Sequence, residues 1–437
     1  MIGTLIGKTI IFVENIFKYN ASSFPGRMVL KLFPNYLKKL KYPELVIMVT
    51  GSSGKGSTTK YIADTLRKNN MTVCHNDMGS NLLDGVATAI IKCTKGKTVK
   101  SDALVLEVDE RYLKYVTSYI KANVIAINNI TRDQPPRQGN YEEVFGEIVK
   151  GLNTDTLVIN ADDPLLKRFE DYFNGKIIYY GIDKNQYSFN ELDDIKNTAY
   201  CPKCHTKLVY SYYHYSSVGD FECPKCDFDR GKINYEITSI KDGYITINDE
   251  VKINIDNDTL FNLYNIVNTY TICKTIKLSD EQIINSLNAD KTMEKLFNEY
   301  TVKNRKYIIL NCKAENNSTY NLNLLHVLKD EEKKTLVIGL REISRRYNHF
   351  DLSWLWDINF EILKDNNVDK IICAGPYRYD IAVRIKYAGF DEKDIIIMEN
   401  TNGMKEIIEN QTSGNVYGIL NFDYVEPFIK ETKGGKK

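Results

Sequence analysis

The 437-residue chain has little excess charge of either sign and no hydrophobic run long enough for a membrane-spanning helix. Its 58 lysines and arginines nearly balance 57 aspartates and glutamates, which gives a formal net charge of +1. A balance this close argues against a polybasic protein that binds nucleic acid. The apolar start, residues 1–17, is interrupted by Lys8 and Glu14, whereas a membrane span needs about 20 predominantly apolar residues. The sequence therefore argues against a nucleic-acid binder and an integral membrane protein, and leaves room for a local anion site.

A secretory signal and a disulfide framework are also missing. No small-residue cleavage site follows the apolar start, and nine cysteines are an odd number for a set of disulfides. We therefore expect a cytoplasmic protein, in which free and metal-bound thiolates survive. The N-terminal stretch is expected to form an amphipathic helix packed on the body of the protein, and peripheral contact with a membrane is the alternative.

Short β-branched runs alternate with helix-like segments from residue 44 onward. Continuous apolar runs suit strands that are buried on both faces of a parallel sheet, and alternation with helices predicts an α/β layer architecture. The runs form two series: 45–50, 103–109, 123–130, 156–162 and 176–182, then 306–312, 335–340, 370–375, 394–399 and 415–420.

These series predict two α/β domains with a small insertion. We expect an N-terminal helical segment at 1–43, a first domain at 44–300 and a C-terminal domain at 301–437. Residues 199–232 have no helical period and interrupt the first domain. Two β-like stretches, 233–240 and 244–255, and a helical segment at 262–276 follow the insertion.

A glycine-rich loop directly follows the first predicted strand and leads into a helical segment. Glycines let backbone N–H groups approach phosphates, and a helix N-terminus adds positive potential, so strand, loop and helix together predict a phosphate cradle. Lys55 can reach the β- and γ-phosphates of ATP, and a hydroxyl beyond it can hold Mg²⁺. An exposed glycine-rich turn is the alternative. The candidate loop comprises Gly51, Ser52, Ser53, Gly54, Lys55, Gly56, Ser57 and Thr58.

The loop departs from the usual phosphate-loop pattern at two positions. Val49 stands where the first glycine belongs, and Gly56 stands where Ser or Thr usually follows the lysine. The hydroxyl that binds Mg²⁺ must then come from Ser57 or Thr58, and Ser57 is our candidate.

Acidic residues end the next strand of the first series. Glu107 and Asp109 lie at the end of the run 103–109 and Glu110 follows it. A carboxylate at the end of a neighbouring strand suits a Mg²⁺–ATP site. Glu107 is the candidate ligand; solvated charges at a strand end are the alternative. The segment 128–140 follows a further strand and would place Arg132, Asp133 and Arg137 on the same edge of the sheet. A polar loop that contains Pro135 and Pro136 is the default alternative.

Four of the nine cysteines form two identical knuckles. Cys201 and Cys204 precede Cys223 and Cys226 in the pattern C-x₂-C-x₁₈-C-x₂-C, which lies within the spacing range of tetrahedral Zn²⁺ sites. Four protein ligands leave no open position, so we expect a structural Zn²⁺ that folds the insertion. Redox-active dithiols are the alternative.

These motifs come in an order that resembles the Mur-type ATP-dependent amide ligases. The four-cysteine insertion and the segment 351–361 narrow the resemblance to the MurT family, the ligase subunits of lipid II isoglutaminyl synthases. The resemblance covers nearly the whole chain. Beyond the phosphate loop and the acidic strand end, its motifs are Pro25-Gly26, His75–Asn81, the start of 128–140, Asn160–Pro164, Phe261–Asn265 and Asp351–Glu361.

The resemblance implies a fold and an activity. It implies a Mur-ligase-like central ATPase domain with an inserted zinc ribbon and a C-terminal Rossmann-like α/β domain. It implies ATP-dependent amidation of the D-glutamate α-carboxylate in the lipid II stem peptide through an acyl phosphate. The ammonia would come from a GatD-like class I glutaminase, and the lipid-linked precursor would bring this cytoplasmic protein to the inner face of the membrane.

The resemblance also implies roles for residues outside the loop. Asn262 and Asn265 would contact the nucleotide, with Lys55 and Glu107 in catalysis. Asp351 would complete the Cys–His pair of the glutaminase; since 351–363 reads as a helix start, a helix N-cap is the equal alternative for Asp351.

Three departures from the family pattern are visible. Gly56 replaces the threonine that follows the lysine, Thr292 stands at or near a family arginine, and residues 341–350 replace an Asn- and Gly-rich segment. Two other functions therefore stay open: a Mur-type amino-acid or polyglutamate ligase, and a nucleotide-binding scaffold that docks a glutaminase without ligating.

Overall fold

The computed structural model describes residues 2–77, 79–131, 140–190, 200–256, 258–288, 297–312, 317–340 and 352–434. The chain separates into two compact units. The first comprises the described residues up to Asn288, and the second comprises those from Phe297 onward together with Thr131 and Asn140. Each unit is considered by itself.

Helices form the N-terminal segment, as expected. They are α1 (Ile2–Ile16), α2 (Phe24–Leu32) and the short 3₁₀ helix η1 (Leu37–Lys39). Pro25 lies in the first turn of α2, where its missing N–H removes no helical hydrogen bond. No helix in the described part of the chain is both long and apolar enough to cross a membrane.

The first unit is built on a nine-stranded sheet with the order β13-β12-β11-β8-β7-β6-β1-β5-β2. Neighbours pair in parallel from β2 to β11, and β11, β12 and β13 are antiparallel. The strands are β1 (Leu45–Thr50), β2 (Val73–His75), β5 (Ala103–Glu107), β6 (Ala122–Ile127), β7 (Thr154–Asn160), β8 (Lys176–Ile182), β11 (Tyr235–Lys241), β12 (Tyr244–Ile247) and β13 (Val251–Asn254). The short strands β3 (Thr94–Lys95) and β4 (Thr98–Val99) form a separate ribbon.

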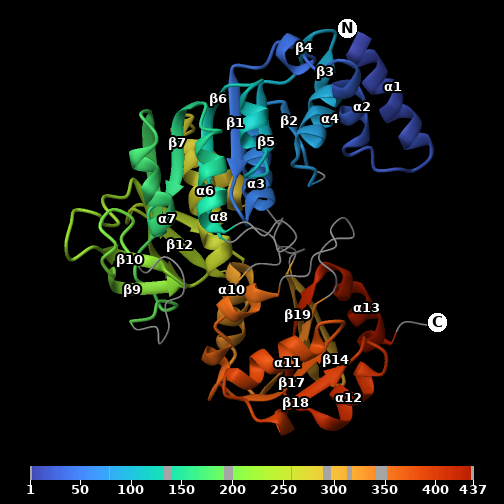
Figure 1. The fold of residues 1–437 in the computed structure, drawn as a ribbon, viewed down its shortest axis with the longest axis vertical. Helices are drawn as coiled ribbons and strands as arrows, with labels where there is room; N and C mark the ends of the chain where they lie inside the picture. The colour runs from blue at the N-terminus through green and yellow to red at the C-terminus, as the bar shows by residue number, and fades with distance from the viewer. Residues whose placement is uncertain are drawn as a thin grey trace. The chain divides into compact units, whose positions relative to one another are not determined.

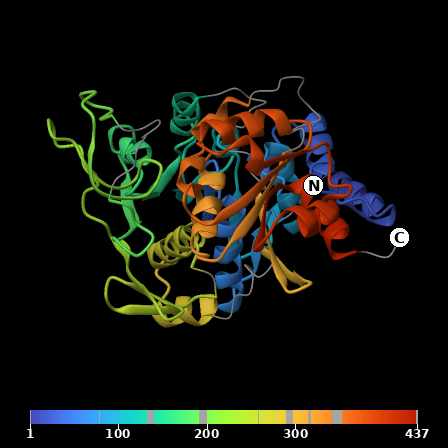
Figure 2. The same cartoon turned by 90° about the horizontal axis from the view of Figure 1, so that it is seen from below.

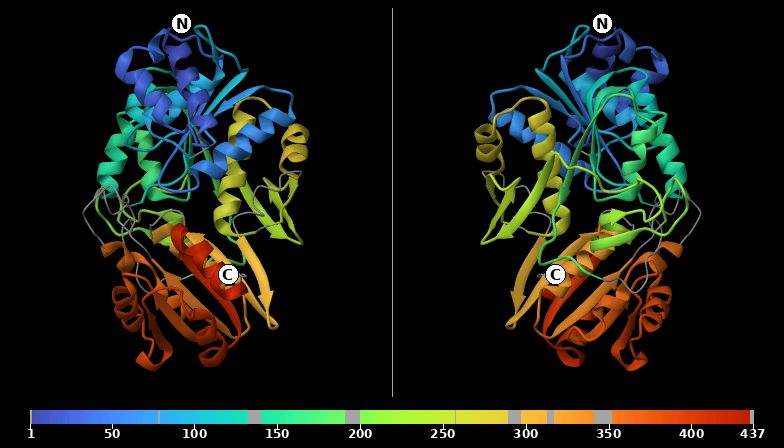
Figure 3. Two further views of the ribbon diagram at one scale, coloured as in Figure 1. Left: turned by 90° about the vertical axis from the view of Figure 1, so that its right-hand side faces the viewer. Right: turned by 90° about the vertical axis from the view of Figure 1, so that its left-hand side faces the viewer.

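Helices cover both faces of this sheet (Figure 1). One face packs on an apolar cluster that includes Met48, Leu106 and Ile127 from the central strands. The opposite face carries α3, α8 and α9, and α3 and α8 contact each other (Figure 3). The helices are α3 (Lys55–Lys68), α4 (Leu83–Cys93), α5 (Leu113–Thr117), α6 (Tyr141–Val149), α7 (Pro164–Lys167), η3 (Arg168–Asp171), α8 (Leu260–Thr275) and α9 (Asp280–Asn288).

The second unit has a six-stranded sheet with the order β14-β15-β19-β16-β17-β18. Only β14 at its edge is antiparallel. The strands are β14 (Phe297–Val302), β15 (Arg305–Cys312), β16 (Lys334–Gly339), β17 (Val368–Ala374), β18 (Ile395–Met398) and β19 (Asn415–Asn421).

Helices lie on both faces of the second sheet, in orange and red in Figures 2 and 3, and two apolar clusters fill the two layers. The parallel sheet with two helical layers confirms the predicted Rossmann-like architecture. The helices are α10 (Asn317–Leu328), η5 (Ser353–Asp357), η6 (Phe360–Leu363), α11 (Arg378–Tyr387), η7 (Glu392–Asp394), α12 (Met404–Gln411) and α13 (Phe422–Lys433).

The cysteine-rich insertion lies between β8 and β11 of the first unit. Its two strands, β9 (Val209–Tyr215) and β10 (Val218–Glu222), form an antiparallel pair outside the main sheet. Leu208, Phe221 and Phe228 pack with the cysteines in a small cluster of their own. A core of this size is too small to hold a fold without a further staple.

Candidate active site

The predicted site lies at the point where the strand order of the first sheet reverses. β1 pairs with β5 on one side and with β6 on the other, and ligands of open α/β sheets bind outside the carboxyl ends of the strands at such a point. Glu107, at the end of β5, is the register partner of Val49. The glycine loop, the acidic strand end and the segment after β6 therefore meet at one edge.

The glycine loop turns into α3 through two residues with positive φ. Gly51 has φ +125° and Gly54, the residue that caps α3, has φ +77°; both values favour glycine. A Cβ on Gly54 would lie 2.7 Å from Oδ1 of Asn265 and 2.9 Å from Nδ2 of Asn128. No described side chain caps the N-terminus of α3, so its first N–H groups are available to an anion.

Two asparagines that follow β6 hold the loop in place. The backbone N–H of Ser52 donates to the carbonyl of Asn129 at 3.0 Å, and that of Ser53 donates to Asn129 Oδ1 at 2.9 Å. Asn128 Nδ2 donates to the Ser53 carbonyl at 3.2 Å and to Thr58 Oγ1 at 3.1 Å. These bonds fix the cradle before any ligand arrives, which lowers the entropic cost of binding.

Lys55 is buried at the mouth of the loop. Its Nζ donates to Glu110 Oε2 at 3.0 Å and to the carbonyl of Gly51. Burial alone would lower the pKa of Lys55, but the carboxylates of Glu110, Asp109 and Glu107 outweigh it and raise that pKa. Lys55 therefore carries its positive charge throughout the neutral range.

Glu107 faces the loop from the end of β5. Its Oε1 accepts a hydrogen bond from Asn81 Nδ2 at 2.9 Å, and its backbone N–H and C=O are both paired with the Asn76 amide at 2.8 Å. A Cβ on Gly56 would lie 3.1 Å from Glu107 Oε2. The absence of a side chain at position 56 thus lets this carboxylate approach the first turn of α3.

The two hydroxyls proposed for the metal have different surroundings. Thr58 is fully buried and its Oγ1 donates to Asn265 Oδ1 at 3.1 Å. Ser57 is half-buried and lies one residue from Gly56. Since Thr58 is bound within the protein, Ser57 is the better placed of the two to bind Mg²⁺ together with Glu107.

Helix α8 brings three asparagines to the back of the loop. Asn262 Oδ1 accepts from the Tyr61 hydroxyl at 3.0 Å, and Asn268 Nδ2 donates to Asn128 Oδ1 at 2.9 Å. Asn265 is 4% exposed, and its Nδ2 has no hydrogen-bond partner among the described residues. A buried amide with a free donor is costly unless a ligand accepts from it, which fits a nucleotide at this edge.

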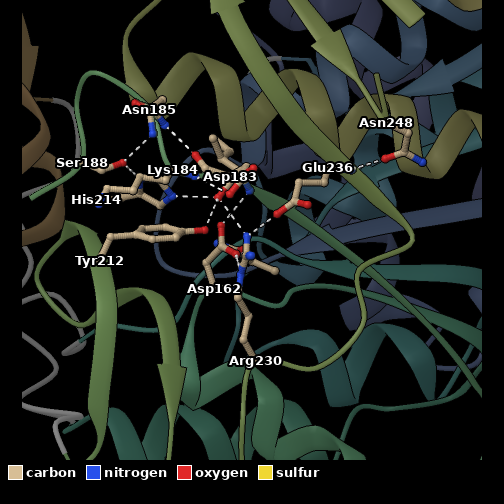
Figure 4. A network of polar contacts seen from close by, with 12 residues as sticks. Asp162, Asp183, Lys184, Asn185, Ser188, Tyr212, His214, Arg230, Glu236 and Asn248 are labelled. Carbon is tan, nitrogen blue, oxygen red and sulfur yellow. Dashed lines mark hydrogen bonds and ion pairs between the residues drawn. The ribbon is translucent and has the colours of Figure 1, made fainter. Parts of the chain in front are cut away.

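A polar network around Asp162 connects the insertion to α8. Figure 4 shows Asp162 with Arg230 and Glu236. Asp162, directly after β7, is fully buried and accepts from Arg230 Nε at 2.7 Å, from Tyr264 OH at 2.8 Å and from the Ile182 N–H at 2.9 Å. Arg230 also donates to Glu236 at 2.6 Å. Arg230 follows the second cysteine knuckle and Tyr264 lies between the asparagines of α8, so Asp162 connects the two elements.

The buried carboxyl of Asp163 should make the stability of the protein depend on pH. It caps α7, where its Oδ1 accepts from the Leu165 N–H at 2.9 Å, and burial raises its pKa to about 7. The folded state therefore binds this proton more tightly than the unfolded chain, so the stabilisation is present at low pH and is lost as pH rises from about 4 to 7. We expect Asp163→Asn to flatten the slope, with about 2 kcal/mol less change in unfolding free energy between pH 7.5 and 5.

Urea unfolding followed by circular dichroism across this range measures the slope. The matched control is Asp155→Asn, an aspartate of β7 whose side chain is 65% exposed. A variant Asp163→Asn with the wild-type slope would contradict the assignment of the proton to this carboxyl.

The four predicted cysteines come together in the insertion. All four sulfur atoms lie within 4.8 Å of one another, with Cys201 and Cys226 at 3.5 Å and Cys204 and Cys223 at 3.4 Å. Four thiolates at about 2.3 Å from a tetrahedral Zn²⁺ lie about 3.8 Å apart, so the donor set fits this ion. The nearby His214 does not belong to this donor set. It is buried, and its Nε2 lies 2.8 Å from the Ile182 carbonyl.

Several predicted residues lie outside the part of the chain that the structure describes. They are Asp351, Thr292, Arg132, Asp133, Arg137 and the segment 341–350. The remaining candidates all belong to the first unit and gather around the loop or in the insertion.

The sequence reasoning missed the asparagines that brace the loop. Asn81, Asn128 and Asn129 hydrogen bond to candidate residues, and Asn268 hydrogen bonds to Asn128. The first three lie in motifs of the family resemblance, but no role was predicted for any of the four. One signal was available for the last of them, because asparagines at 262, 265 and 268 recur on one face of a helix. The ion pair of Lys55 with Glu110, and not with Glu107, could not be predicted from the sequence.

Two protein-family models match the chain. The Mur ligase middle domain matches residues 49–221, and the MurT ligase C-terminal domain matches residues 314–423. The first match contains the phosphate loop and most of the insertion.

Curated relatives match nearly the full length. The MurT subunit of lipid II isoglutaminyl synthase (glutamine-hydrolyzing) from Staphylococcus aureus strain COL is 28% identical over 94% of this chain and 92% of the relative. The subunit of the same name from Streptococcus pneumoniae strain R6 is 24% identical over 96% of this chain and 94% of the relative.

Solved structures share the fold at lower identity. A pseudomurein peptide ligase type C from Methanothermus fervidus has a TM-score of 0.68 and 19% identity, over 91% of this chain and 80% of that chain. The MurF ligase from Thermotoga maritima, solved in complex with ADP, has a TM-score of 0.61 and 16% identity, over 94% and 84% of the two chains. The predicted Mur-ligase-like α/β fold is therefore confirmed.

Proposed function

We infer that this chain belongs to the Mur ligase family and, within it, to the MurT group, and we propose that it is the ligase subunit of a lipid II isoglutaminyl synthase. It is an amide ligase of the ATP-dependent Mur class. The proposed reaction converts the D-glutamate α-carboxylate of the lipid II stem peptide to an amide, giving D-isoglutamine.

The observation that carries the proposal is the preformed phosphate cradle at the switch point of the first sheet. Among the described residues, the N-terminus of α3 has no side-chain cap and Asn265 Nδ2 has no hydrogen-bond partner. Together with the buried cation of Lys55, these groups offer donors to an anionic nucleotide. Ser57 and Glu107 would hold Mg²⁺, which neutralises phosphate charge when bound.

The chemistry follows from these groups. Transfer of the γ-phosphoryl group to the substrate carboxylate yields an acyl phosphate, ammonia attacks its carbonyl carbon, and phosphate leaves as the amide forms. Lys55 stabilises the negative charge that develops on the transferred phosphoryl oxygens, because a fixed cation in a site shielded from water is worth more than one in solution.

Structural Zn²⁺ in the insertion is a second part of the proposal. Cys201, Cys204, Cys223 and Cys226 supply four sulfur ligands and no open position, so the ion would stabilise the insertion and take no part in ligation. The small apolar cluster around them supports this role.

A GatD-like class I glutaminase is the proposed source of ammonia. The second unit has a groove of about 320 Å³ beside residue 352, directly after Asp351 in the chain. Trp356 and Tyr379 line it and are 44% and 58% exposed. Exposed tryptophan and tyrosine are typical of protein interfaces, which supports docking of the glutaminase here and a role for Asp351 in fixing the tautomer of its histidine.

ATP turnover with lipid II tests the function. We expect ADP release and amidated product with glutamine only when a candidate glutaminase is present, and with ammonium chloride in its absence. Product formation from a free amino acid in place of ammonia would instead support a Mur-type amino-acid ligase, and no turnover with either nitrogen source would support a non-ligating scaffold.

The variant Asp351→Asn should separate the release of ammonia from glutamine from the ATP-dependent amidation itself. If Asp351 orients the partner's histidine, the variant complex should lose glutamine-dependent amidation by about 10³-fold or more and keep ammonium-dependent amidation. Asp365→Asn, at an exposed aspartate of the same unit, is the matched control and should retain both. Equal loss of both activities, or of neither, would reject this role for Asp351.

A further inference from the structure

Exposed apolar side chains concentrate at the start of the chain. Of the 19 large hydrophobic residues that are exposed in the described part of the chain, nine lie between Ile2 and Leu32. Seven of the nine lie in α1 or within three residues of its end, and α1 contacts α2. Together they form an exposed apolar patch, and such patches mark interaction sites.

Helix α1 turns its small residues inward and most of its large ones outward. Gly3, Thr4 and Gly7 are its buried residues. A Cβ on Gly7 would lie 2.8 Å from the Ile91 side chain, and Thr4 Oγ1 hydrogen bonds to the Tyr36 hydroxyl at 3.0 Å. The helix is therefore fixed to the first unit by these small residues and by Ile11, which is partly buried against the apolar cluster of that unit.

The large residues of α1 share the opposite face. At 100° per residue, positions 2, 5, 9, 12, 13 and 16 fall on one side of a helix and positions 3, 4 and 7 on the other. The exposed fractions are 66% for Ile2, 70% for Leu5, 66% for Phe12, 44% for Val13 and 60% for Ile16. Phe17 and Tyr19, both 68% exposed, extend this apolar face beyond the helix.

Basic residues accompany the apolar face. Residues 1–43 hold seven lysines and arginines and one glutamate, although the whole chain has a net charge of only +1. Lys8, Lys18 and Lys31 are exposed within or directly beside the apolar positions. Apolar residues on one side with a basic rim are the combination that binds anionic bilayers.

We propose that α1 and α2 bind the surface of an anionic lipid bilayer, with the apolar face of α1 in the interfacial region and the lysines at the headgroups. A protein partner would need an acidic rim to match these charges, whereas an anionic membrane supplies both an apolar layer and the negative charge. This surface is separate from the phosphate cradle and does not depend on the proposed reaction.

Co-sedimentation with vesicles that contain no lipid-linked precursor tests the proposal. We expect the full-length protein to bind vesicles with 30% phosphatidylglycerol at least about tenfold more tightly than pure phosphatidylcholine vesicles, because each basic residue near an anionic surface is worth about a factor of five. The binding should weaken at high salt, which screens the lysines.

Two variants locate the contact. Phe12→Glu/Ile16→Glu changes only exposed side chains, so the melting temperature should stay near that of the wild type while vesicle binding falls at least about tenfold. Tyr244→Glu, at a 48% exposed residue of β12, is the matched control and should bind vesicles as the wild type does.

Two outcomes would overturn the proposal. One is equal sedimentation with anionic and neutral vesicles, or with neither. The other is a concentration-dependent dimer that the double variant abolishes while vesicle binding is unchanged, which would assign the face to a second copy of the chain.

Discussion

Replacing Lys55 with methionine is expected to lower the rate of ATP-dependent ligation by about 10² to 10³-fold, the usual cost of removing one donor that stabilises developing charge. Methionine keeps the length and apolar stem of the side chain and removes only the ammonium group. The rate of ADP release in the presence of lipid II and ammonium chloride measures the effect directly.

The substitution also changes stability, because Lys55 Nζ is paired with a carboxylate. Glu110 is 4% exposed and lies 3.0 Å from Nζ, and an unpaired buried charge costs about 3–5 kcal/mol. The double variant Lys55→Met/Glu110→Gln removes both charges and should recover most of the lost stability without recovering ligation. This separation shows whether the lost rate reflects the missing cation or a damaged fold.

Lys60→Met is the control for this pair. Lys60 lies on the same helix and is half-buried, but it makes no contact with the loop in the described structure, so ligation should continue at the wild-type rate. Ligation by the stable double variant at the wild-type rate would mean that the loop is not the phosphate site.

The fold could be predicted because a continuous apolar run indicates a strand that is buried on both faces of a sheet. The runs at 45–50 and 176–182 coincide with β1 and β8 residue for residue, because strands in the middle of a parallel sheet are buried on both faces and have few polar positions. The edge elements were harder to predict. β2 has only three residues and β14 is an antiparallel edge strand, so neither has a long apolar pattern that could reveal it.

The parts of the site formed by residues close together in the sequence could be predicted. The parts that depend on tertiary contacts could not. Gly54 and Lys55 belong to one turn, and their spacing alone indicates a phosphate loop. Asn128 and Asn268 contact each other across 140 positions of sequence, and no local pattern connects them. The glycine at position 56 looked like a defect in the motif, but the close approach of Glu107 to that position gives a steric reason for it.

Replacing Cys201 with serine is expected to reduce bound zinc from about one ion per chain to none. Serine is a poor zinc ligand, and three remaining thiolates no longer close the tetrahedron. Structural zinc supplies about 10–16 kcal/mol of binding free energy in small zinc-finger peptides, so the insertion should unfold locally. Elemental analysis of the purified protein measures the zinc, and hydrogen exchange of β9 and β10 measures the unfolding.

Cys273→Ser is the matched control, because Cys273 is a buried thiol of α8 outside the cluster. It should keep the full zinc content, although the buried hydroxyl will cost some stability. Undiminished zinc in Cys201→Ser with normal protection of β9 and β10 would refute structural zinc. A reversible loss of two thiols on mild oxidation of a zinc-free wild type would favour the redox alternative.

Loss of zinc should also weaken nucleotide binding at a distance. Arg230 lies four residues beyond Cys226 and donates to the Asp162 carboxylate at 2.7 Å. Tyr264 of α8 donates to the same carboxylate at 2.8 Å. If the insertion unfolds, Asp162 loses its cationic partner while it stays fully buried, so α8 should lose part of its anchor beside Asn265. We therefore expect Cys201→Ser to bind ATP about tenfold more weakly, as expected from a coupling free energy of 1–2 kcal/mol, whereas Cys273→Ser should retain wild-type affinity. Wild-type ATP affinity in a zinc-free protein would show that the insertion is anchored to the site but not coupled to it.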